Sequence, residues 1–283
     1  MRKNPVLENE MKRYTRNMKC AWIILGVNLV LALFALIAQM GLSGRENYMT
    51  ILQYRFPIQC YVLMGYGLFL AICILIPGLA GGAIAGERER KTLDLLLTTH
   101  LSPWKIILGK LESSFSTLPV IGLVLIYGGI TLVNLFQLIL NLVITGIFIG
   151  SIAIFYSAII RKTTVAVILS YVTVVLLVFG TMGILFGTGY IQQMRGMYQE
   201  GFTGIRLGGL VYLLYFNPAV TLYGLIGQQT TNAYGLVRLC DYFGDYSHSF
   251  GVEHMVELSI LVQLGCSALL LIAAGRHINP MRK

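Results

Sequence analysis

Charged residues are scarce in this 283-residue sequence. Lys, Arg, Asp and Glu make up 12% of it, about half of the fraction usual for a soluble domain. Five long stretches contain no charged residue: 21–40, 57–86, 113–160, 163–194 and 258–275. A helix needs roughly 20 apolar residues to cross the hydrocarbon of a bilayer. The missing charge therefore excludes a soluble protein and indicates an integral membrane protein.

The middle of these stretches also lacks ionisable residues that could support chemistry. Carriers driven by an ion gradient usually keep an ionisable group near the midplane. Intramembrane hydrolases need a nucleophile with its base, or metal ligands, at depth. The five cysteines show no paired spacing, which argues against a zinc or disulfide framework. The energy for any work by this protein must therefore come from outside the bilayer. All four histidines lie outside the stretches: His100, His248, His254 and His277.

The apolar sequence that is present divides into spans of an all-α integral membrane protein. We predict a single transmembrane domain over 1–283, with six spans at 20–40, 58–85, 111–131, 136–160, 165–187 and 256–275. Residues 188–254 form the predicted outer loop. Asn217-Pro218 interrupts the uncharged run 207–227 within this loop, which predicts short or re-entrant helices. If 207–227 spans instead, there are seven helices and the basic C-terminal tail falls outside.

Lys and Arg residues give the orientation. With six spans and both termini in the cytoplasm, 16 of the 21 Lys and Arg residues lie on the inner side. This distribution follows the positive-inside rule. Trp22 and Trp104 then both lie at the inner interface, where amphipathic aromatic residues are enriched. We therefore expect a multi-pass protein of the cell membrane with cytoplasmic termini.

An amphipathic helix is predicted at 4–19, ahead of the first span. Its apolar stripe recurs at helical spacing, and lysines and arginines surround it. A helix of this kind lies along the membrane surface. The stripe consists of Leu7, Met11, Tyr14 and Met18.

A second amphipathic segment lies between the second and third spans. Charges of alternating sign at 87–94 are followed by leucines at helical spacing, which predicts a short surface helix at 87–98. A charged helix between two spans is suited to contact with a soluble partner. A solvated loop that obeys the positive-inside rule is the alternative. The charged residues are Glu87, Arg88, Glu89, Arg90, Lys91 and Asp94, and the leucines are Leu93, Leu96 and Leu97.

This segment carries a family resemblance. Residues 86–97, followed by Leu101-Ser102-Pro103-Trp104 and Leu108-Gly109-Lys110, resemble the loop between spans two and three in permease subunits of type-2 ABC transporters. The opening Asn4-Pro5-Val6-Leu7 and the six-span layout are also similar to that family. Members often have Gly where Lys91 stands, Glu at Asp94 and Pro at His100, which leaves the fine contact geometry open.

The resemblance implies a coupling helix at 87–98 that docks on a cytoplasmic ABC ATPase subunit. Its contacts would come from Glu87, Arg88, Glu89, Arg90, Asp94, Leu96 and Leu97. The helix at 4–19 would be an interface helix that also touches the ATPase. A second permease chain, identical or not, would complete the substrate pathway within membrane lipid, and export is the direction that the family favours. No nucleic acid partner is expected.

No cofactor is expected in this chain, and no catalytic or metal-binding residue. ATP and Mg would bind in the partner ATPase, because the sequence has no phosphate-loop pattern around Gly109-Lys110. A polar group in the outer loop matches no metal site by spacing. That group consists of Asp241, Asp245, His248, Glu253 and His254.

Small residues repeat at the inner end of the second span. Gly78, Gly82 and Gly86 follow Pro77 at intervals of four. This spacing favours close helix packing within one chain, and a hinge that transmits motion of the coupling segment is the alternative.

Two other functional hypotheses stay open at this point. A membrane scaffold or assembly protein without transport accounts equally well for spans that lack charge. A gradient-driven carrier is disfavoured, because the middle of the predicted spans lacks the ionisable residues that such carriers usually need. The sequence leaves open the substrate, the direction of transport beyond the family expectation, and the choice between homodimer and heterodimer.

Overall fold

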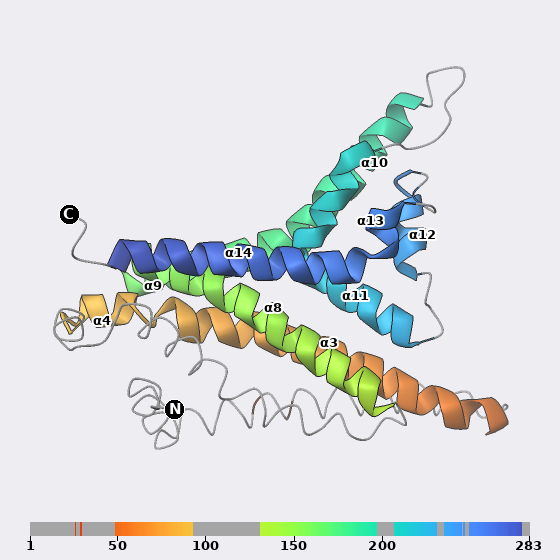
Figure 1. Cartoon of the computed structure of the whole chain (residues 1–283), viewed down its shortest axis with the longest axis horizontal. Coiled ribbons are helices and arrows are strands. Elements are labelled where there is room, and N and C mark those ends of the chain that lie inside the picture. Colours follow the sequence, from red (N-terminus) through yellow and green to blue (C-terminus); the bar gives the residue numbers. More distant parts are fainter. Residues whose placement is uncertain are drawn as a thin grey trace. The chain divides into compact units, whose positions relative to one another are not determined.

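The computed structural model describes residues 26, 29, 49–92, 131–196, 207–230, 235–244, 246 and 249–278. All regular structure in these residues is helical (Figure 1), in agreement with the predicted all-α class. The helices are α3 (Met49–Gly81), α4 (Ala85–Glu89), α8 (Leu132–Ile159), α9 (Thr163–Val175), η2 (Leu176–Gly180), α10 (Thr181–Gly196), η3 (Gly208–Phe216), α11 (Pro218–Gln229), α12 (Gly235–Asp241), α13 (Phe250–Glu253) and α14 (Met255–Ile278).

Four helical segments in the described part of the chain are long and apolar enough to cross a membrane. They are Tyr61–Glu89, Leu132–Ile159, Thr163–Met194 and Met255–Ile278. These correspond to the predicted spans 58–85, 136–160, 165–187 and 256–275. The chain is therefore a multi-pass membrane protein. The predicted span 111–131, apart from Thr131, and the helix at 4–19 lie outside the described residues, as does the span 20–40 except for Gly26 and Leu29.

Helix ends differ most from the prediction in two places. Helix α3 begins at Met49, ahead of the predicted span 58–85, because 49–56 contain neither Gly nor Pro to stop a helix. The segment that starts at Thr163 continues to Met194, seven residues beyond the predicted end.

The chain divides into two compact units, which are described separately. The first consists of Met1–Tyr171 and Cys266–Lys283, and the second of Val172–Gly265.

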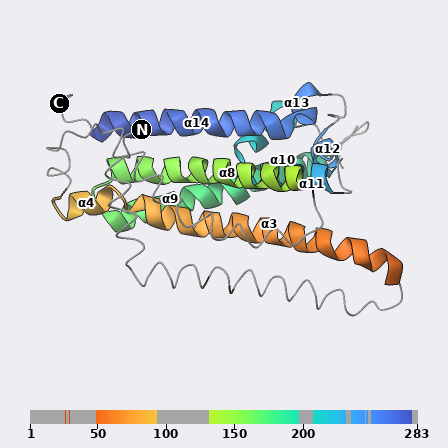
Figure 2. The same cartoon turned by 60° about the horizontal axis from the view of Figure 1, so that its bottom comes forward.

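In the first unit, α3 and α8 lie side by side and run in the same direction. Figures 1 and 2 both show this pairing, with α3 in orange and α8 in green. The Tyr61 hydroxyl donates to the Asn134 carbonyl at 3.4 Å, and the Ile84 N–H donates to Ser157 Oγ at 2.9 Å. Both pairs are 73 residues apart in sequence. A sequence separation that stays constant along the contact shows that the two helices are parallel.

Glycines of α3 allow α9 to approach closely. A Cβ added at Gly81 would lie 3.2 Å from Val167 Cα, and one added at Gly78 would lie 2.9 Å from the Tyr171 hydroxyl oxygen. That hydroxyl donates to the Ile74 carbonyl at 2.6 Å. Small residues at such crossings bring two helix backbones into van der Waals contact, which is a main source of helix association in membranes.

The second unit contains a sharp break at Asn217. Helices η3 and α11 meet there at 90°. Asn217 Oδ1 caps α11 by accepting from the Ala219 N–H at 2.9 Å, and Pro218 occupies the first turn. The sequence signal at Asn217-Pro218 therefore corresponds to a real interruption.

The other end of the Asn217 side chain stabilises a π-helical turn. Its Nδ2 donates to the Val178 carbonyl at 2.9 Å and to Thr181 Oγ1 at 2.7 Å. Val178 lies in η2, the π-helical turn between α9 and α10. Wide turns of this kind disturb the usual i→i−4 bonding of the backbone. The fully buried Asn217 amide supplies a donor to a carbonyl in that turn.

Buried hydroxyl groups differ in how well they are satisfied. Thr221 is 2% exposed, and its Oγ1 lies 3.1 Å from the Asn217 carbonyl oxygen and 2.9 Å from Gln263 Nε2. Thr145 of α8 is 0% exposed, and its Oγ1 has no hydrogen-bond partner within the described part of the chain. Asn141, one helical turn earlier, is also buried with both side-chain polar atoms unpaired there. A buried polar group without a partner costs about 1–3 kcal/mol.

Two threonine-to-valine substitutions should therefore have opposite effects on stability. Thr145→Val removes an unpaired hydroxyl with little change of shape, so we expect stabilisation by about 1 kcal/mol. Thr221→Val leaves donors and acceptors unpaired, so we expect destabilisation by about 1–3 kcal/mol. Thermal unfolding in one detergent, followed with a thiol-reactive dye that reaches the buried Cys240 on unfolding, measures both. Equal losses in the two variants would contradict the assignment of Thr145 as unpaired.

Helix α4 ends in a Schellman motif. The Thr92 N–H donates to the Glu87 carbonyl at 2.9 Å, and the Lys91 N–H donates to the Arg88 carbonyl at 3.1 Å. These are the two bonds that define the motif, whose C′ position requires a left-handed backbone. Lys91 occupies that position with φ of 58°. Glycine is the usual residue there, because a Cβ strains this conformation.

Replacing Lys91 by glycine should relieve this strain. The Lys91 side chain is exposed, so few contacts are lost, and we expect Lys91→Gly to stabilise the protein by about 0.5–1 kcal/mol after the entropy of glycine in the unfolded chain is counted. Lys91→Ala is the matched control, because it removes the charge and retains the Cβ. A rise of melting temperature in Lys91→Ala equal to that in Lys91→Gly would show that charge, and not backbone strain, is responsible.

Candidate functional site

The first candidate site is where α3 and α8 finish in the first unit. We name it the α4 end, and it consists of 82–92 together with the turn 160–163. The Glu89 carboxylate accepts a hydrogen bond from the Thr163 hydroxyl at 2.5 Å. A Cβ at Gly82 would lie 3.2 Å from Thr163 Cγ2. The parallel course of α3 and α8 brings these two chain segments to the same end, as Figures 1 and 2 show for α4, α8 and α9.

Ser157 closes a break between α3 and α4. Helix α3 stops at Gly81 and α4 starts at Ala85, so the backbone between them leaves the regular helical pattern. The Ile84 and Ala85 N–H groups both donate to Ser157 Oγ at 2.9 Å. All three residues are buried. Water cannot satisfy such groups in an apolar interior, so the hydroxyl of a neighbouring helix holds the break in place.

The acidic and basic side chains of the α4 end differ in their hydrogen bonding within the described residues. The Thr92 hydroxyl donates to the Glu87 carboxylate, and Glu89 accepts from Thr163. The side chains of Arg88 and Arg90 form no hydrogen bond or ion pair with other residues of the described segments. The acids are therefore used to shape the turn, and the cations remain available. Exposed basic residues at this end are Arg90, Lys91, Arg161 and Lys162.

The structure places part of the predicted coupling set. Glu87, Arg88, Glu89 and Arg90 lie together at the α4 end, whereas Asp94, Leu96 and Leu97 lie outside the described residues. Helical structure runs from Ala85 to Glu89 and stops there, and residues 93–98 of the predicted helix 87–98 lie outside the described residues. The physical reason for the stop is the Schellman motif, in which the left-handed Lys91 turns the chain before a further helical turn forms. The stripe of the predicted interface helix also lies outside the described residues: Leu7, Met11, Tyr14 and Met18.

The glycines singled out in the sequence face α9. Gly78 meets Tyr171, and Gly82 meets the Thr163 methyl group. At Gly86 an added Cβ would be 3.7 Å from Thr163 Oγ1, which is ordinary contact. Pro77 lies inside α3, one residue before this contact begins. These positions support close packing within the chain, and a hinge at them remains a prediction.

Ser157 and Thr163 were not singled out from the sequence. Serine and threonine are common in membrane helices, and most donate to a carbonyl of their own helix, as Ser151 does to Phe148 at 2.7 Å. A signal was available at Thr163, since it directly follows the turn residues Arg161 and Lys162. No sequence pattern distinguished Ser157, because its partners are 72 and 73 residues away.

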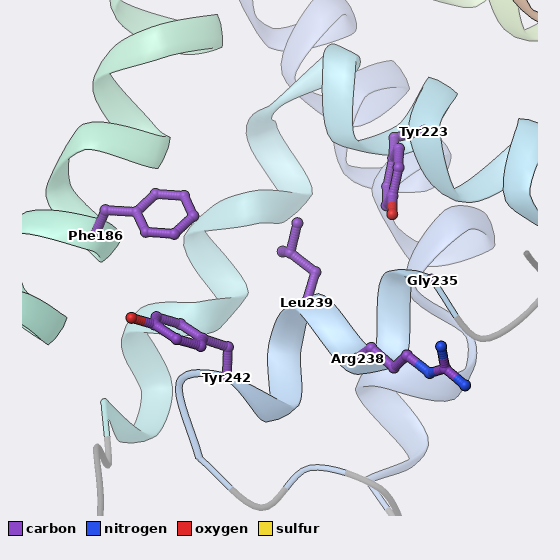
Figure 3. Close-up of a pocket in the computed structure, with 6 residues that line it drawn as sticks. All are labelled: Phe186, Tyr223, Gly235, Arg238, Leu239 and Tyr242. Carbon is purple, nitrogen blue, oxygen red and sulfur yellow. The ribbon is translucent and has the colours of Figure 1, made fainter.

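The second candidate site is a hollow of about 400 Å³ in the second unit. Figure 3 shows Phe186 from α10 at one side and Tyr223 from α11 at the other, with Leu239 of α12 between them. The Arg238 side chain extends away from Phe186 in this view. The hollow is lined by Phe186, Tyr223, Gly235, Arg238, Leu239 and Tyr242.

The polar group predicted not to bind metal is partly described. Asp241 Oδ1 accepts from the Tyr246 N–H at 3.2 Å, and the His254 ring lies 4.5 Å from that of Phe250. Within the described segments, no group of three or more His, Cys, Asp or Glu side chains is placed to hold a metal ion. Asp245 and His248 lie outside those segments.

Comparison with known proteins identifies the family. A family model described as "ABC-2 family transporter protein" matches residues 43–275, which is most of the chain and includes the α4 end, all of the second unit and most of the first. A search of curated proteins gave no match. The match agrees with the resemblance drawn from the charged segment at 86–110. The chain belongs to the ABC-2 transporter family and is a multi-pass membrane permease of that family.

Proposed function

We propose that this chain is the permease subunit of an ATP-driven exporter, and that a separate cytoplasmic ATPase acts on its α4 end. The observation that carries the proposal is the attachment of the charged turn at 85–92 to two other spans. Ser157 of α8 holds the start of α4, and Thr163 of α9 holds Glu89. A partner that moves this turn therefore moves the ends of three membrane helices together.

The charge at the α4 end supports a cytoplasmic position. Its two chain segments carry five basic residues, namely Arg88, Arg90, Lys91, Arg161 and Lys162. Positively charged loops remain on the cytoplasmic side of a membrane. The parallel direction of α3 and α8 agrees with one predicted span, 111–131, between them. Both termini are then cytoplasmic in the six-span arrangement.

The spans themselves supply no energy source. ATP and Mg bind in the partner ATPase in this proposal, and this chain contributes only the pathway and the attachment point. A second permease chain, identical or related, completes the pathway. In the most apolar 18 residues of the segment Thr163–Met194, only 22% is buried within the chain. The exposed apolar surface of this segment is suited to contact with lipid or with a second protein chain.

The free cations at the α4 end should control ATPase binding. Arg90→Glu reverses an exposed charge that has no partner among the described residues, so we expect roughly tenfold less copurified ATPase, which corresponds to about 1.4 kcal/mol. Arg276→Glu is the matched control, since Arg276 is an exposed arginine at the end of α14. Copurification from native membranes, quantified by mass spectrometry, gives the ratio.

Each result has a clear meaning. Loss of the ATPase with Arg90→Glu alone supports coupling through the α4 end. Equal retention of the ATPase by both variants, with the chain normally inserted, would contradict that role. Finding no ATPase with the unaltered chain would instead favour a membrane scaffold.

A further inference from the structure

The hollow in the second unit combines partly exposed aromatic rings with an arginine side chain that has no partner among the described residues. Its walls come from α10, α11 and α12, which all belong to that unit. Its volume, about 400 Å³, lies in the range of small-molecule sites. The family match does not assign a ligand to this place, so its chemistry has to be inferred from the lining.

One side of the hollow is apolar and firmly supported. The Phe186 ring lies 5.1 Å from the ring of Phe243, which is fully buried. The Tyr242 ring lies 6.1 Å from that of Phe186. Yet Phe186 is 50% exposed and Tyr242 is 56% exposed. The rings are therefore fixed by their neighbours while much of their surface is left for an apolar group.

The other side of the hollow is cationic. The Arg238 side chain is exposed and forms no hydrogen bond or ion pair with the described residues. The nearest acid along α12, Asp241, already accepts from the Tyr246 N–H at 3.2 Å. Tyr223 lines the same side, where its hydroxyl adds a neutral donor (Figure 3). A guanidinium in this setting binds a carboxylate or phosphate with two parallel N–H donors.

The two sides are separated along α12. Leu239 lies between Arg238 and the Phe186–Tyr242 pair in Figure 3. A small inorganic anion would use only the cationic side, and a neutral apolar molecule only the aromatic side. The arrangement fits one elongated molecule with an acidic head and an apolar body.

We infer that this hollow binds an anionic amphiphile, with its acidic head at Arg238 and its apolar chain across Leu239 toward Phe186 and Tyr242. Phe186 lies in the segment Thr163–Met194, which is apolar enough to cross a membrane. The hollow is therefore accessible to molecules that concentrate at a membrane surface. The inference goes beyond the proposed function and does not depend on an ATPase partner.

Photolabelling of the full chain in nanodiscs of zwitterionic lipid tests the inference. The probe is a fatty acid with a diazirine near the end of its alkyl chain, and labelled residues are located by mass spectrometry. We expect labelling concentrated at Phe186 and Tyr242, roughly tenfold weaker in Arg238→Gln, as loss of one charge-assisted hydrogen bond would give. Arg276→Gln, which removes the same charge elsewhere, should label as the unaltered chain does.

Competition adds a readout that needs no variant. Unlabelled fatty acid should displace the probe from the unaltered chain, whereas the fatty alcohol of equal length should not. Labelling spread evenly along the exposed faces of α9 and α10, or equal displacement by acid and alcohol, would overturn the inference. Either result would mean that the hollow holds bulk lipid without recognising its head group.

Discussion

Helix breaks in a membrane leave backbone groups that only the protein itself can satisfy. The described residues include such breaks between α3 and α4 and at Asn217, and a polar side chain closes each of these two. Ser157 accepts from two N–H groups where α3 ends. Asn217 caps α11 and donates into the π-helical turn η2. Because an unsatisfied backbone group costs several kcal/mol in hydrocarbon, these two side chains fix the positions of the segments that follow them.

The functional consequence is greatest at the α4 end. If the charged turn at 85–92 were joined to α3 alone, it could move without displacing the other helices. Here the hydroxyls of Ser157 and Thr163 join it to α8 and α9 as well, and glycines bring α9 against α3. A push on the turn is therefore transmitted to several helices, which is what a permease driven from outside the bilayer requires.

Sequence patterns predicted elements better than they predicted contacts. Long uncharged runs coincide with four helices that are long and apolar enough to span a membrane, because hydropathy acts over some 20 residues and no tertiary partner is needed to see it. Asn217-Pro218 marked the break before α11 for the same local reason. The role of Ser157 was missed, since its partners are more than 70 residues away. The end of α4 at Glu89 was not predicted, because the residue in the left-handed position is Lys91 and not the glycine that usually signals such an end.

The most direct measurement is lysine-directed crosslinking on native membranes that contain the full chain. Lys91 and Lys162 are the lysines of the α4 end, and both are exposed. If this end receives the ATPase, Lys91 will crosslink to a nucleotide-binding cytoplasmic subunit. Crosslinks from Lys91 only to proteins that bind no nucleotide, or labelling of Lys91 by an impermeant amine reagent added outside intact cells, would contradict a permease driven through its α4 end.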